Sequence, residues 1–172
     1  QKATSHIESW YGFHSSFIAA RYFPEKQLDE ALRSRFDYLF GLLHDRTKMV
    51  PLYHASRIQN TSGTIGLLVD KYEAYGDVED LKKASRLADW LMNTWQRKDG
   101  AYVNHNTVYT SVIYVAKSML ELTLVERELG KTESVWKEAA DRHYASAKRA
   151  IDQLVASQGD FETEGELTFE DG

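Results

Sequence analysis

Apolar residues recur at helical spacing through most of this chain, and this periodicity is the feature that most constrains its fold. In the stretch 24–43, for example, Leu28, Leu32, Phe36 and Leu39 fall three or four residues apart, on one face of an α-helix. The same pattern predicts helices over about 5–22, 24–43, 61–75, 77–95, 107–129 and 132–157. No stretch forms a convincing strand, so the sequence predicts an all-α fold.

The connections between these helices alternate in length, which predicts helical hairpins. Three links are tight, at Phe23-Pro24, Gly76-Asp77 and Gly130-Lys131. The long loops are expected at roughly 46–60 and 97–106, with 158–172 as a third. A weak repeat of about 55–60 residues supports this organisation: "DKYEAYGD" (70–77) matches "LVERELGK" (124–131) in spacing. All long loops then fall at one end of a stack of three hairpins.

The distribution of charge predicts which helices are inner and which are outer. The stretches 61–75 and 107–129 are apolar nearly all round, whereas 77–95 and 132–157 carry many charged residues. A helix that is apolar on all sides is buried, and a helix with one apolar stripe lies outside. We therefore expect an inner row formed by the first helix of each hairpin and an outer row formed by the second.

Composition narrows the classes of function. With 172 residues, the chain has the length of one domain with a sizeable core. A net charge of −5 argues against nucleic acid as the main partner. No run of about 18 apolar residues exists, so no membrane span is predicted. The chain has no Cys, which excludes disulfides and thiolate chemistry.

Two short motifs, "KDGAYVNHN" (98–106) and "TFEDG" (168–172), together with the hairpin pattern, resemble the six-hairpin glycosidases and the toroidal polysaccharide lyases. The resemblance implies an (α/α)6-type toroid with the long loops on one face. Residues 1–172 would form a single partial toroid domain of three hairpins, expected to continue beyond 172. The rest of the ring would come from missing residues or another chain.

The resemblance implies a carbohydrate-active enzyme that cleaves glycosidic bonds of a polysaccharide or oligosaccharide by hydrolysis. We expect neither a cofactor nor a metal, no membrane or nucleic-acid partner, and a periplasmic or extracellular location in a bacterium. A non-catalytic helical-repeat module that binds glycan or protein is an alternative from a different class.

The acidic stretch "GDFETEGELTFEDG" (159–172) is the first candidate for catalysis by hydrolysis. It holds six carboxylates and no basic residue. A glycosidase needs two carboxyl groups, one held protonated and one that activates water or attacks the sugar. Glu170 and Asp171 are the preferred pair, with Glu166 next. The alternative is that these residues are solvated, hold the loop open or bind a cation.

The stretch "YVNHNTVY" (102–109) supports a polysaccharide lyase as the second enzymatic hypothesis. It is similar to the Asn-His motif of toroidal lyases, in which polar groups neutralise a uronate carboxylate beside the proton that is removed. The resemblance gives His105 a catalytic role and Tyr102, Asn104, Asn106 and Tyr109 contacts with substrate. The competing interpretation is that Asn106 caps the following helix and that its neighbours shape the turn.

His54 and Trp10 complete the expected sugar contacts. His54 lies in the first long loop beside Tyr53 and Arg57, and Trp10 lies on an expected inner helix. An aromatic ring at such a position can wall a sugar subsite. Packing within the loop and the core is the competing role for both residues.

Overall fold

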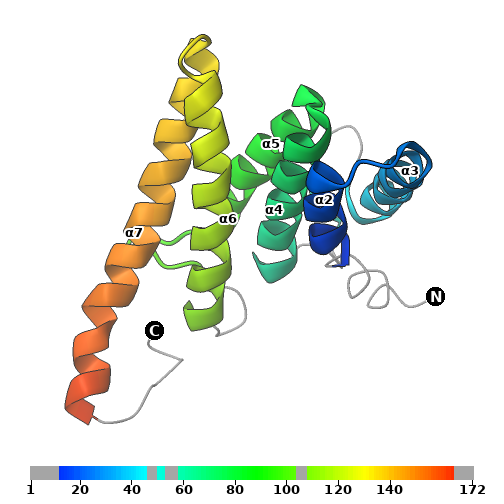
Figure 1. Cartoon of the computed structure of the whole chain (residues 1–172). Helices are drawn as coiled ribbons and strands as arrows, with labels where there is room; N and C mark the ends of the chain where they lie inside the picture. The colour runs from blue at the N-terminus through cyan, green and yellow to red at the C-terminus, as the bar shows by residue number, and fades with distance from the viewer. Residues whose placement is uncertain (1–11, 46–49, 53–57, 104–107, 165–172) are drawn as a thin grey trace.

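The protein is described by a computed structural model covering residues 12–45, 50–52, 58–103 and 108–164 (Figure 1). Within these ranges the chain is all-α, as predicted. The loops contain isolated β-bridges, and no β-strand is present in the described part. The helices are α2 (Gly12–Tyr22), α3 (Lys26–Leu43), α4 (Ile58–Tyr75), α5 (Val78–Trp95), α6 (Val108–Leu129) and α7 (Ser134–Glu164).

Helix α4 is the centre of the fold. It packs against α2 on one side, α6 on the other, and its hairpin partner α5. Helix α7 packs along α6 and touches α5. Figure 1 shows α2, α4 and α6 as one row, with α4 and α6 both beginning at the lower end of the view. Helix α3 is seen nearly end-on, so the first hairpin departs from the regular arrangement of the other two.

Burial agrees with the predicted division into inner and outer helices for α4 and α5, whereas α6, also expected to be buried, keeps exposed residues such as Leu124 at 66%. From Thr61 to Val69 every residue of α4 is buried, so this helix has no solvent face over more than two turns. Helix α5 buries a single stripe that includes Leu81, Ala84, Leu87 and Leu91. The two patterns agree with an apolar helix inside and an amphipathic helix outside.

Some helix boundaries agree with the expected ranges and others differ. The helix expected from about 77 begins at Val78, and Asp77 caps it by accepting the backbone N–H of Glu79. The last helix was expected from about 132, but α7 begins at Ser134, and the Thr132 hydroxyl donates to the Leu129 carbonyl at the end of α6. Helix α7 also continues to Glu164, so the stretch 158–164 is helical and the expected third loop does not begin at 158.

The two long loops begin with the same hydrogen-bond pattern, which supports the internal repeat. His44 ends α3 and forms an antiparallel bridge with Pro51, while Gln96 ends α5 and forms one with Tyr102. In the second loop the backbone N–H of Arg97 donates to the Ala101 carbonyl. The N–H of Asp45 donates to Val50 in the equivalent way.

One buried cation joins three helices. The Lys71 ammonium of α4 lies 2.9 Å from a carboxylate oxygen of Asp80 on α5 and 2.9 Å from one of Asp37 on α3. Lys71 and Asp80 are both buried. The ammonium also lies 5.0 Å from the centre of the Phe36 ring. A buried charge is tolerated when it is paired in this way, and loss of one partner is strongly destabilising.

Two glycines in the connections between helices, Gly76 in a tight link and Gly100 in a long loop, give a matched test of local packing. Gly100 has φ +103, and a Cβ there would stand 2.4 Å from the Arg149 carbonyl oxygen of α7. Gly76 has φ +74, and a Cβ there would meet no atom within 4 Å. Gly100→Ala should therefore lower the free energy of unfolding by about 3 kcal/mol or more, because strain and a backbone clash add.

Gly76→Ala should cost only about 1 kcal/mol, the ordinary penalty for an L-residue with a left-handed backbone. Urea denaturation of both variants gives the comparison. Equal losses in the two variants would mean that the 97–103 loop does not pack on α7 as described.

Candidate functional site

Polar side chains gather on the face that α2, α4 and α6 share. The Nδ1 atom of His14 on α2 lies 2.5 Å from a carboxylate oxygen of Asp70 on α4. Two turns further along α2, Arg21 forms an ion pair with Glu73 of α4 at the same distance. These two pairs hold α2 against α4 through polar contacts, beside the aromatic packing of the core.

Gly66 lets side chains from the two flanking helices meet over α4. At the point where a Cβ would stand, the nearest atoms are His14 Cε1 at 3.3 Å, Ser118 Oγ at 3.3 Å and Glu121 Oε2 at 3.6 Å. His14 comes from α2, and Ser118 and Glu121 come from α6. A larger residue at 66 would push these groups apart, so the glycine forms the floor of a polar site.

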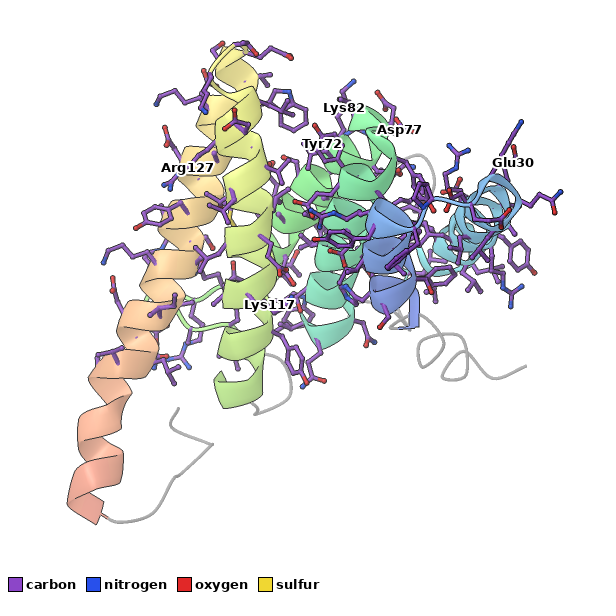
Figure 2. The ribbon with its side chains drawn as sticks, viewed as in Figure 1. Glu30, Tyr72, Asp77, Lys82, Lys117 and Arg127 are labelled. Carbon is purple, nitrogen blue, oxygen red and sulfur yellow. The ribbon has the colours of Figure 1, made fainter. Side chains whose placement is uncertain are left out.

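We call His14, Asp70, Lys117 and Glu121 the inner-face cluster. Lys117 donates to both carboxylate oxygens of Glu121, at 2.7 and 2.9 Å. The side chains of His14, Asp70 and Glu121 keep 28%, 17% and 40% of their accessible surface, so solvent reaches the cluster. Figure 2 places Lys117 partway along α6, well below the tight-link end where Lys82 and Asp77 lie.

The Asp70 carboxylate holds the ring of His14 in place. A carboxylate bound to Nδ1 fixes the orientation of an imidazole, as in hydrolases that use a His–Asp pair. Glu121 adds a second carboxylate from another helix. Among the described residues, however, no group of three or more His, Asp and Glu side chains is arranged to hold a metal ion.

Sequence inspection missed this cluster because its members come from three helices far apart in the chain. One short pattern in the sequence could have indicated the cluster. The buried helix α4 carries Gly63, Gly66, Asp70 and Glu73 at intervals of three or four residues, which is a small and polar stripe on an otherwise apolar helix.

Most of the predicted site residues lie outside the described ranges. These are Glu166, Glu170, Asp171, Asn104, His105, Asn106, His54 and Trp10. The backbone of Tyr109 lies in the first turn of α6, and its side chain is outside the described part. Because α6 begins at Val108, Asn104-His105-Asn106 immediately precedes an inner helix, which is the place that the lyase resemblance requires.

Tyr102 has a structural role that differs from the expected substrate contact. Its side chain is fully buried, and its hydroxyl lies 2.6 Å from the Ser146 hydroxyl of α7. Burial raises the pKa of Tyr102 to about 12, an effect that the Ser146 hydrogen bond and Arg149 partly offset. Tyr102 therefore fastens the 97–103 loop to α7 and does not face a substrate.

A second titratable cluster is buried between α5, α6 and α7. His143 of α7 lies 2.8 Å from Glu126 of α6 through Nδ1, and 3.3 Å from Asp89 of α5 through Nε2. Nitrogen atoms of Arg142 and His143 converge on Asp89, and Arg142 donates to both of its carboxylate oxygens. His143 and Glu126 are completely buried.

Electrostatics favours the charged form of this cluster. Burial alone would lower the pKa of His143, but hydrogen bonds and attraction from Asp89 and Glu126 outweigh it, and the pKa is raised. For Asp89, burial acts to raise the pKa, and the bonds from His143 and Arg142 reverse the effect, so that the pKa is lowered. The native state therefore favours an imidazolium between two carboxylates.

Comparison with protein-family models, with curated proteins and with solved structures finds no match to this chain. A search of the described helices finds none that is both long and apolar enough to cross a membrane. The assignment of function therefore depends on the sequence motifs and on the geometry of the site.

The His143 cluster predicts how stability depends on pH. Because the native pKa of His143 exceeds the unfolded value of about 6.5, its stabilising contribution is complete below that pH. The contribution is lost as pH rises through the native pKa. Glu126→Gln should lower the melting temperature by removing a buried charge partner, at a cost of about 3 kcal/mol. The fall in melting temperature between about pH 5.5 and about pH 8.5 should also shrink.

Glu128→Gln is the matched control, since it removes an exposed carboxylate two residues further along α6. Thermal denaturation of the parent and both variants at the two pH values gives the comparison. A Glu126→Gln variant that keeps the parental pH dependence would contradict the assignment of charge to His143.

Proposed function

We propose that this chain is part of a carbohydrate-active enzyme that cleaves glycosidic bonds of a polysaccharide or oligosaccharide by hydrolysis. The observation that carries the proposal is the convergence of carboxylates from two inner helices, Asp70 and Glu121, with His14 on one solvent-reachable face. Carboxylate and imidazole groups gathered in this way can bind several sugar hydroxyls at once.

The arrangement of helices supports a toroidal form of this enzyme. The hairpins α4–α5 and α6–α7 stack with α4 and α6 inside, and a further inner helix, α2, continues the row. In the proposed (α/α)6-type toroid this row would line the substrate-binding face, and the remaining hairpins would come from further residues or another chain. An extracellular or periplasmic location follows from a polymeric glycan substrate.

In this proposal the inner-face cluster and the acidic segment have separate tasks. Glu170 and Asp171, supported by Glu166, are the acid and base that act on the glycosidic bond. The inner-face cluster binds the sugar, because exposed carboxylate, imidazole and ammonium groups satisfy several hydroxyls at once.

A polysaccharide lyase is the second candidate, and the position of α6 favours it. Asn104-His105-Asn106 directly precedes the α6 N-terminus at Val108, where backbone N–H groups and the helix dipole favour a uronate carboxylate. The products distinguish the two enzymes. Hydrolysis creates only a reducing end, whereas β-elimination also creates a conjugated uronate that absorbs ultraviolet light.

The first experiment follows both signals while the purified protein is incubated with neutral and uronate-containing polysaccharides. New reducing ends without ultraviolet absorbance would support the hydrolase. A parallel rise of both would support the lyase. Binding without either signal would support a non-catalytic glycan-binding module, and absence of binding and turnover on the whole panel would contradict the proposal.

Glu170→Gln and Asp171→Asn test the assigned acid and base. Either variant should lose turnover by at least about a hundredfold, since removal of a general acid or base has effects of that size. The melting temperature should stay nearly unchanged. Initial rates on the substrate that the panel identifies provide the measurement, and full activity in both variants would sink this assignment.

Glu121→Gln tests the role of the inner-face cluster, with Glu128→Gln as the control. Both residues lie on α6, and both pair with a lysine at the surface. Glu121→Gln should raise KM about tenfold while kcat changes little, because it removes a charge-assisted contact used in binding. Glu128→Gln should leave both constants unchanged, and an equal effect of the two substitutions would mean that Glu121 has no special place in the site.

A further inference from the structure

A groove runs between the outer helices α5 and α7, on a part of the surface that the inner-face cluster does not reach. Its volume is about 410 Å³. The lining residues come from the N-terminal parts of the two helices: Val78, Lys82, Ser85, Arg86 and Asp89 from α5, and Val135, Trp136, Ala139 and Arg142 from α7, with Glu133 just before α7. The groove therefore lies at the tight-link end, where Figure 2 shows Lys82 and Asp77.

The groove combines an apolar floor with an apolar edge that is open to solvent. Trp136 and Ala139 are buried and form the floor. Val135 and Val78 stand at the edge, and Val135 keeps 62% of its accessible surface. An apolar surface rimmed by polar residues is the usual composition of a recognition site.

Three cations line the groove, and their pairing differs. Lys82 bonds to Glu79, and Arg142 bonds to Asp89 through two nitrogens. Arg86 is exposed and has no ion-pair or hydrogen-bond partner among the described residues. A guanidinium in this position can bind a carboxylate through two parallel hydrogen bonds.

The groove runs lengthwise along α5, which suits an elongated occupant such as a helical peptide. Its α5 lining extends from Val78 to Asp89, three turns of helix, or about 17 Å along the axis. A helix laid along such a groove places apolar residues at intervals of three and four into the floor. The net charge of −5 disfavours a polyanion such as nucleic acid, but one carboxylate beside apolar residues complements Arg86.

We propose that the α5–α7 groove is a docking site for a short amphipathic helix of a partner protein. The partner inserts apolar side chains over Trp136 and Ala139 and places a Glu or Asp carboxylate on Arg86. The site is on the outer helices, so it is independent of the glycan-cleaving activity proposed for the inner face.

The test uses a fluorescently labelled, helix-stapled synthetic peptide with leucines on one face and glutamates beside them. Fluorescence anisotropy against the full chain should show saturable binding. A second peptide with glutamine in place of every glutamate should bind about tenfold more weakly, the ratio for one charge-assisted hydrogen bond. Arg86→Gln should weaken binding of the glutamate peptide by a similar factor and leave the glutamine peptide unaffected.

Two further variants fix the location. Val135→Ser, at an exposed lining position, should weaken both peptides, because it removes apolar contact and not charge. Arg35→Gln removes an exposed arginine of α3, outside the groove, and should change neither affinity. Absence of saturable binding, equal affinity for the two peptides, or equal effects of Arg86→Gln and Arg35→Gln would each overturn the proposal.

Discussion

The ion pair between Lys71 and Asp80 is the constraint on which the other features of this fold depend. Both side chains are buried, so neither charge can be left without the other. Because Lys71 lies on the central helix α4 and also binds Asp37, the pair sets the positions of α5 and α3 around it. Lys83 strengthens the arrangement by donating to Asp80 from the next turn of α5. The hairpin α4–α5 is then a fixed frame for α2 and α6.

Two surfaces with different chemistry are built on this frame. The inner surface carries His14, Asp70 and Glu121, which are held by pairing and by the absence of a side chain at Gly66. The outer surface carries the groove, whose basic side includes the unpaired Arg86. The His143 cluster lies between the two surfaces and connects α5, α6 and α7. One stack of helices therefore presents a polar inner face and a separate outer groove that share no residues.

The helices, the hairpins and the inner and outer rows could be predicted from the sequence, because each depends on local periodicity and local capping. The Leu81, Ala84, Leu87 and Leu91 stripe of α5 is an example. The end of α7 could not be predicted so well. The repeat placed a loop from 158, but nothing between Ser157 and Glu164 breaks a helix except Gly159, and one glycine costs only about 1 kcal/mol in a helix.

The candidate site was less predictable than the fold because it depends on contacts between distant segments. His14 and Asp70 carry no local sign of their pairing, which arises only when α2 packs on α4. Tyr102 illustrates the opposite error: its neighbours suggested a sugar contact, but its burial depends on Ser146 of α7, which no motif near residue 102 indicates. At Gly130, the Lys137 backbone nitrogen lies 2.8 Å from the position of a Cβ, so close packing and not a left-handed backbone requires the glycine, which the sequence around 130 does not indicate.

Gly66 also determines how closely side chains of α2 and α6 approach each other over α4. On the inner side of α4 only a hydrogen atom separates the side chains of α2 from those of α6, whereas the outer side of the same helix is filled by Leu81, Leu87 and other bulky residues of α5. A Cβ at position 66 would stand 3.3 Å from both His14 and Ser118, so a larger side chain there would require α2 or α6 to move. The spacing of three helices thus depends on the absence of a side chain at one position of the central helix.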